Sequence, residues 1–287
     1  MMLYDSIFEM LKKKKVIICD VLTIISFFFL LLIGFLLVLS PWVQEAMIKK
    51  EITKYNIASF SEEEIQDNID HKKPFPENAS IEAPDFLKVL ANISSVKRED
   101  VIGAVVIEGD TVSLPILHGT NTRNLLVGAT TVKNGQVMGK GNYVLAGHHM
   151  RDDRLLFGPL LKIEKGAYIH ISDKRKIFTY KVKEKKIVHE TDVSVLADTR
   201  SPELTLITCD VTGIDTDKRV IVKAELVDTN DNSNQAEFEG KYGYGMGTEP
   251  TLHSNVTYFL WVLLVVGLPC VLVFIMLIIK RRKDEAR

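Results

Sequence analysis

Two long apolar runs stand near the ends of this 287-residue chain. The first, residues 21–39, would reach roughly 28 Å as a helix at about 1.5 Å per residue, the thickness of a bilayer core. The second, residues 257–279, starts near Tyr258 and Trp261, aromatic residues that favour a membrane interface. A cleavable signal peptide is the alternative for the first run, but the run is long and no small-x-small cleavage site follows. We therefore predict two transmembrane helices, at residues 16–40 and 257–279.

The hydrophobic pattern changes between these two runs. From about residue 86, short apolar or alternating segments recur, separated by Gly, Asn and Asp. Such segments, with few helical patterns between them, predict an all-β domain, a barrel or a sandwich, over residues 86–228. Strands are expected at residues 101–107, 142–146, 167–171, 177–182, 186–189, 204–209 and 219–226.

Polar segments join this domain to the apolar runs. Residues 41–85 are predicted to form an extracellular stalk, helical at first, with Ser61 as a helix N-cap before three glutamates. Three prolines then break the pattern. Residues 229–256 are rich in Asn, Gly, Glu and Ser, which predicts a flexible tether.

The charge distribution predicts the orientation of the chain. A formal net charge of −1 gives no argument for a nucleic-acid partner. Basic residues cluster beside both apolar runs, at residues 12–15 and 280–283. By the positive-inside rule, residues 1–15 and the basic tail 280–287 are cytoplasmic, and the domain between the anchors is extracellular.

The candidate chemistry centres on a single thiol. Of the three cysteines, Cys209 alone lies in the predicted barrel, at the end of an apolar strand. It has no disulfide partner within the domain, so it is either a buried small residue or a nucleophile. His148 follows another strand end, where scaffolds present catalytic groups. Arg219 opens the strand after Cys209, and strand pairing would place its guanidinium beside the thiol.

Three motifs in this order resemble the sortase family of Gram-positive transpeptidases. They are Leu145-Ala146-Gly147-His148, Thr205-Leu206-Ile207-Thr208-Cys209 and Arg219-Val220-Ile221-Val222. Residues 124–150 and 156–160 resemble the class A, housekeeping type. The resemblance implies a closed eight-stranded sortase-type β-barrel with short helices, here flanked by two transmembrane helices.

The resemblance also implies an activity, that of a membrane-anchored cysteine transpeptidase. Cys209 would attack the Thr–Gly bond of a Leu-Pro-x-Thr-Gly sorting signal on a surface protein and hold the product as a thioacyl enzyme. The amine of a lipid-linked peptidoglycan precursor would release it, attaching the protein to the cell wall. His148 would transfer protons and Arg219 would stabilise the substrate and the oxyanion. The substrate-binding residues would be Ala146, Ile207 and Thr208.

No cofactor is expected. Some class A members bind calcium through acidic residues before the histidine strand, but this stretch carries Lys133, Gln136 and Lys140. A zinc site made by His148, His149 and Cys209 is disfavoured, because two adjacent histidines suit one metal poorly.

The second anchor leaves one alternative open within the family. A C-terminal anchor is typical of the pilin-polymerising class, which also carries an Asp-Pro-aromatic lid. This chain has Lys73-Pro74-Phe75 and Ala83-Pro84-Asp85 there instead. We therefore favour surface-protein anchoring over pilus assembly. A non-catalytic peptide-binding membrane receptor is a third reading, and the intact Cys209, His148 and Arg219 argue against it.

Overall fold

The computed structural model describes residues 2–77, 86–108, 112–150, 152–210, 217–231, 274–276 and 279. The chain divides into two compact units. One comprises residues 1–39 and 248–287, and the other comprises residues 40–247.

The first unit contains most of helix α1 (Met2–Lys54). Among the described residues, Ile18–Lys54 is the one helical stretch long and apolar enough to cross a membrane. The sequence analysis predicted two such helices, and one candidate is found. The second predicted helix, residues 257–279, lies outside the described residues except at 274–276 and 279, which are helical, and most of the tether lies outside them too. Within this unit the ring of Phe274 stacks on that of Phe27, with centroids 4.2 Å apart.

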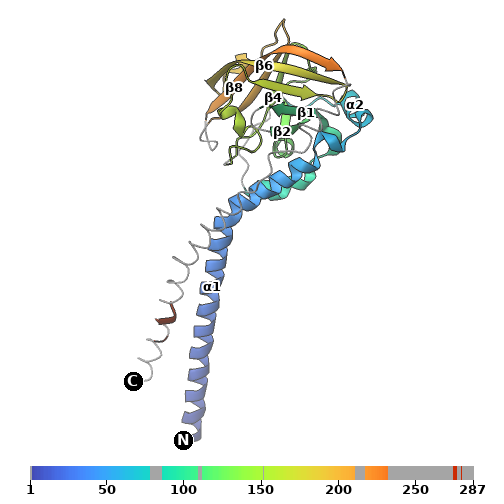
Figure 1. Ribbon diagram of the computed structural model, residues 1–287. Coiled ribbons are helices and arrows are strands. Elements are labelled where there is room, and N and C mark those ends of the chain that lie inside the picture. Colours follow the sequence, from blue (N-terminus) through green and yellow to red (C-terminus); the bar gives the residue numbers. More distant parts are fainter. Residues whose placement is uncertain are drawn as a thin grey trace. The chain divides into compact units, whose positions relative to one another are not determined.

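The second unit is built on a closed eight-stranded barrel, as the resemblance implied (Figure 1). Its strands are hydrogen-bonded in the order β1-β2-β3-β4-β7-β8-β6-β5, and β5 closes the barrel onto β1. The strands are β1 (Val101–Ile107), β2 (Val112–Leu117), β3 (Ala129–Thr131), β4 (Asn142–Ala146), β5 (Tyr168–Ser172), β6 (Lys176–His189), β7 (Glu203–Cys209) and β8 (Lys218–Asp231). Strand β8 continues three residues into the predicted tether.

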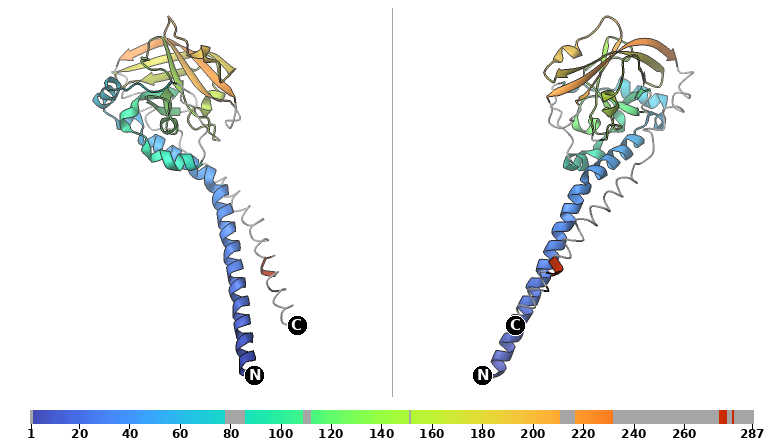
Figure 2. Two further views of the ribbon diagram at one scale, coloured as in Figure 1. Left: turned by 180° about the vertical axis from the view of Figure 1, so that it is seen from behind. Right: turned by 60° about the vertical axis from the view of Figure 1, so that its left-hand side comes forward.

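Short helices complete this unit. Ser61 caps α2 (Glu62–Asp70) as predicted, because its hydroxyl oxygen accepts the Glu64 N–H at 3.1 Å. Helix α2 contacts β1, and both views of Figure 2 show it beside the barrel. The other helices are α3 (Phe86–Asn92), α4 (Thr122–Leu125) and the 3₁₀ turns η1 (Ile57–Ser59), η2 (Ile93–Ser95), η3 (Arg98–Asp100), η4 (Gly158–Leu161) and η5 (Val193–Leu196).

Residues from the predicted stalk contribute to the core of the barrel unit. Ile48 and Ile52, in the last turns of α1, are 0% and 2% exposed and belong to the same hydrophobic cluster as the barrel strands. The Tyr55 hydroxyl donates to the Val96 carbonyl at 2.8 Å. Apolar burial of this kind stabilises a fold in proportion to the area removed from water. The end of α1 is therefore part of the folded catalytic unit.

Shortening a core side chain of α1 is expected to destabilise this unit. Ile48→Ala leaves a cavity that costs about 2–4 kcal/mol, which lowers the midpoint of thermal unfolding by about 5–10 °C in a domain of this size. Leu87→Ala is the matched control, because Leu87 is 74% exposed. Scanning calorimetry of the full chain in detergent measures both variants, and equal midpoints would contradict the packing described.

Candidate active site

Strand pairing brings the predicted catalytic residues together. In the antiparallel β7–β8 pair, Cys209 lies directly opposite Arg219, the arrangement expected from the sequence. In the parallel β4–β7 pair, Ala146 lies opposite Ile207. The chain leaves β4 through Gly147, whose N–H donates to the Ile207 carbonyl at 3.0 Å. His148 follows and therefore emerges beside the end of β7.

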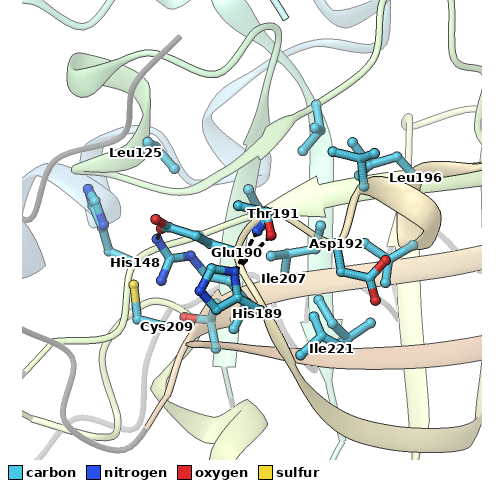
Figure 3. A pocket seen from close by; sticks show the side chains of 18 of the residues that line it. Leu125, His148, His189, Glu190, Thr191, Asp192, Leu196, Ile207, Cys209 and Ile221 are labelled. Atoms are coloured by element: carbon cyan, nitrogen blue, oxygen red, sulfur yellow. Dashed lines mark hydrogen bonds and ion pairs between the residues drawn. The ribbon is translucent and has the colours of Figure 1, made fainter. Parts of the chain in front are cut away.

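All six predicted site residues line one pocket of about 460 Å³ (Figure 3). The Cys209 sulfur and the His148 ring lie at the same end of this pocket. The predicted residues in its wall are Ala146, His148, Ile207, Thr208, Cys209 and Arg219, joined by Glu77, Leu125, Val132, Gly147, Val188, His189, Glu190, Thr191, Asp192, Val193, Val195, Leu196 and Ile221.

The alternation of β7 separates the roles of its last residues. Successive side chains of a strand point to opposite faces, so Ile207 and Cys209 share a face and Thr208 lies on the other. Thr208 is 2% exposed, and its hydroxyl has no hydrogen-bond partner among the described residues. The Thr208 side chain therefore lies on the opposite face of β7 from the Cys209 thiol.

The loop between β6 and β7 forms one wall and is held by a buried side chain. Asn142, 1% exposed in β4, donates through Nδ2 to the carbonyls of Val195 and Ala197 at 3.0 and 2.9 Å. Its Oδ1 accepts the Thr205 hydroxyl at 2.7 Å. One amide thus ties β4 to β7 and to the loop, two of whose residues, Val195 and Leu196, line the pocket.

His148 is buried in this wall as a neutral ring. Its side chain belongs to a residue only 4% exposed, and burial lowers its pKa from 6.5 to about 4. Its Nε2 is buried without a hydrogen-bond partner among the described residues. Buried polar atoms in folded proteins are nearly always paired, so this nitrogen keeps its capacity to exchange a proton with a group that enters the pocket.

Burial of His148 predicts a loss of stability in mild acid. Because the folded-state pKa is depressed, the unfolded chain binds the proton first as pH falls below about 6.5, and stability is lost from there down to about pH 4. The cost reaches about 2 kcal/mol at pH 5. Urea unfolding of the wild type and His148→Gln at pH 7.5 and pH 5 measures it: the wild type is expected to lose more stability than the variant, and parallel losses would contradict the assignment.

Opposing charges act on the Cys209 thiol. Burial raises its pKa, the Arg219 guanidinium lowers it, and the carboxylates of Asp210 and Glu190 raise it further; the net direction is upward. With His148 also neutral, the resting pair is a thiol beside an unprotonated imidazole. The imidazole can then accept the thiol proton when the sulfur attacks.

Glu190 is a site residue that the sequence analysis missed. Its Oε2 lies 2.6 Å from Nη2 of Arg219, and Nη1 of that arginine donates to the Lys218 carbonyl at 3.0 Å. The strand prediction for residues 186–189 stops just before Glu190. The pairing register of β6 with β8, which brings this carboxylate to Arg219, could not be derived from one sequence.

His149, the neighbour of His148, does not line the pocket that contains the thiol. Its Nδ1 lies 3.0 Å from the Asp210 carbonyl and its Nε2 lies 3.1 Å from Oδ1 of Asp153. Both ring nitrogens of His149 therefore have partners in the protein. Among the described residues, no group of three or more His, Cys, Asp or Glu side chains is placed to hold a metal ion.

Comparison with known proteins agrees with this arrangement. A family model described as "Sortase domain" matches residues 105–227. Sortase A of Listeria monocytogenes is 38% identical over 213 residues, which cover 74% of this chain and 94% of that protein. Sortase A of Bacillus anthracis is 39% identical over 159 residues, covering 55% and 74%. The structure of sortase C-3 from Streptococcus pneumoniae matches with a TM-score of 0.50 at 19% identity, covering 68% and 99%, which supports the fold alone. The chain belongs to the sortase family and is a cysteine transpeptidase.

Proposed function

We propose that this protein is a class A sortase that cleaves Leu-Pro-x-Thr-Gly-type sorting signals between Thr and Gly and attaches surface proteins to a peptidoglycan precursor. The observation that carries the proposal is the single pocket in which Cys209, His148 and Arg219 meet. Relatives named sortase A that are 38% and 39% identical favour class A over the pilin-polymerising class.

The pocket supports each chemical step. As the Cys209 sulfur attacks the threonine carbonyl, the neutral His148 ring takes the thiol proton. The ring then gives this proton to the glycine nitrogen, the C–N bond breaks, and a thioester remains. An incoming amine attacks the thioester, loses a proton to His148, and releases the thiolate. Arg219, across the strand pair from the sulfur, is placed to stabilise the oxyanion formed in both steps.

The apolar part of the pocket supports recognition of the Leu-Pro end. Ile207 and Ile221 are paired across β7 and β8 on the face that carries Cys209, and Ala146 adjoins Ile207 from β4. Such a surface buries aliphatic side chains favourably, at about 25 cal/mol per Å². Ala146 and Ile207 thus retain the substrate-binding role given by the resemblance.

A peptide assay tests the proposed function. The full chain in detergent is incubated with a Leu-Pro-x-Thr-Gly peptide and triglycine, and the products are identified by mass spectrometry. The expected product is the peptide cut after Thr and joined to triglycine. A peptide with Thr and Gly exchanged serves as the control. Absence of cleavage, or equal cleavage of both peptides, would overturn the proposal.

Membrane anchoring belongs to the same proposal. The long apolar stretch of α1 supports an anchor in the cell membrane. The basic clusters at residues 12–15 and 280–283 support cytoplasmic termini and an extracellular barrel. In this orientation the pocket would meet exported proteins and a lipid-linked precursor at the outer membrane surface.

Activity is expected to be independent of calcium. Where some class A enzymes place acidic ligands, Nζ of Lys133 lies 3.8 Å from Oδ1 of Asp198, and Lys140 adds a second positive charge nearby. These cations repel Ca²⁺ and cannot ligate it. Transpeptidation rates with chelator and with added calcium should agree within about twofold, whereas a several-fold activation by calcium would contradict the expectation.

A further inference from the structure

The Arg219–Glu190 ion pair is built into the barrel rather than formed by two loose side chains. Val188 lies opposite Arg219 in the β6–β8 pair. Beyond the end of β6, the Glu190 N–H donates to the Asp217 carbonyl at 2.7 Å, which extends the ladder. Because side chains alternate along a strand, Glu190 shares the face of Val188 and is directed at Arg219. Figure 3 shows its side chain pointing towards the end of the pocket that holds Cys209 and His148.

In the resting enzyme the Arg219 guanidinium is already hydrogen-bonded to protein groups. Arg219 is bonded to a carboxylate through Nη2 and to a backbone carbonyl through Nη1. Its side chain is 22% exposed, so solvent screens the pair only in part. Charge-assisted bonds of this geometry fix a guanidinium in both position and orientation.

The same carboxylate affects the thiol. The charged or titratable groups around Cys209 are Arg219 on β8, Asp210 after β7, Glu190 after β6 and His148 after β4, with His189, Asp192 and Glu77 elsewhere in the pocket wall. Of the described residues that line the pocket, Arg219 alone carries a permanent positive charge. The Glu190 carboxylate opposes that charge and so offsets part of the attraction that favours a thiolate.

We propose that Glu190 is a positioning residue for transpeptidation: it holds the Arg219 guanidinium at the place where the oxyanion forms and limits how far this cation stabilises a Cys209 thiolate before substrate arrives. The inference rests on the role proposed above for Arg219. It requires that removing Glu190 has opposite effects on two observables. The free thiol becomes more reactive, whereas turnover of the sorting peptide falls.

Two variants separate charge from positioning. Glu190→Gln keeps an oxygen that can accept from Arg219 but loses the charge, and Glu190→Ala loses both. Glu184→Gln is the matched control, because Glu184 is an exposed residue of β6 outside the pocket wall. Iodoacetamide alkylation of Cys209 in the full-length protein, followed against pH by peptide mass mapping, needs no sorting signal. The alkylation rate therefore tests the inference about Glu190 even if the protein does not cleave the proposed Leu-Pro-x-Thr-Gly peptide.

Both Glu190 variants are expected to alkylate roughly three- to tenfold faster at pH 7, with the pH profile shifted to lower pH. The gain from Glu190→Gln should be smaller in an Arg219→Ala background, where no guanidinium is released. Equal gains in the two backgrounds would overturn the proposal, as would slower alkylation. An identical gain in Glu184→Gln would also overturn it.

Turnover gives the second test, once the wild type is active on the peptide. Glu190→Ala is expected to lose roughly tenfold in kcat/KM, the worth of a charged hydrogen bond, and Glu190→Gln is expected to lose less. In the Arg219→Ala background, Glu190→Ala should cause little further loss. A loss of the same size in both backgrounds would show that Glu190 acts independently of Arg219, and would refute the positioning role.

Discussion

Replacing Cys209 with alanine is expected to abolish transpeptidation, with a loss of at least about 10⁴-fold, the scale seen when a covalent nucleophile is removed. No other described thiol lies in the pocket, because Cys19, the other free cysteine described, belongs to α1. Intact-protein mass spectrometry with a Leu-Pro-x-Thr-Gly peptide should show an acyl adduct on the wild type and none on the variant.

Cys19→Ala provides the control for this experiment, since it removes a thiol distant in the sequence from the catalytic motifs. It should acylate like the wild type. An adduct that persists in Cys209→Ala would refute the nucleophile assignment. Because the replacement removes one sulfur atom from a partly exposed residue, the unfolding midpoint should stay close to that of the wild type, so lost activity cannot be ascribed to unfolding.

His148→Gln is expected to lower kcat by about 10²–10⁴-fold, the usual contribution of a positioned proton-transfer group. The loss should depend on the leaving group. A substrate that carries an aryl ester in place of the Thr–Gly amide releases a group that departs without a proton, so acylation of the variant should recover substantially. Burst kinetics with the amide and the ester measure this difference.

His170→Gln is the matched control, because His170 lies on β5 outside the pocket and pairs with Glu108 at 3.1 Å. It should leave both substrates nearly unaffected. An equal loss on amide and ester in His148→Gln would contradict the role in protonating the leaving group. Such a result would leave His148 with at most the role of accepting the thiol proton, a step that both substrates share.

The sequence analysis predicted segments of six of the eight strands and missed β2 and β3. It divided β6, which is one strand, into two at residues 177–182 and 186–189. β1 and β4 have the predicted bounds, since β1 is a continuous apolar run and β4 is apolar after Asn142, a pattern typical of strands buried on both faces. β2 contains Pro115, which lacks a backbone donor and argues against a strand. β3 has only three residues, too few for a periodic signal.

The catalytic candidates could be predicted from the sequence, but the residues that contact and position them could not. Motif order pointed to Cys209, His148 and Arg219, and the strand register places two of them opposite each other. Glu190 and the amide of Asn142 act through contacts between strands that are distant along the chain, and one sequence does not show which distant strands pair or in what register. Likewise, Ile48 and Ile52 lie in the long helix α1, and only the packing shows that they belong to the barrel core.

The amide of Asn142 also bears on how the protein reaches its active form. It bonds to Thr205 across 63 residues of chain, and β4 and β7 are parallel neighbours that no short turn connects. Contacts so distant in sequence form late, because a long loop must close first. The thiol on β7 therefore meets the imidazole after β4 only once most of the barrel has folded. A nascent or partly unfolded chain would carry a cysteine without its proton acceptor and without its substrate pocket, so folding itself delays the onset of acyl transfer.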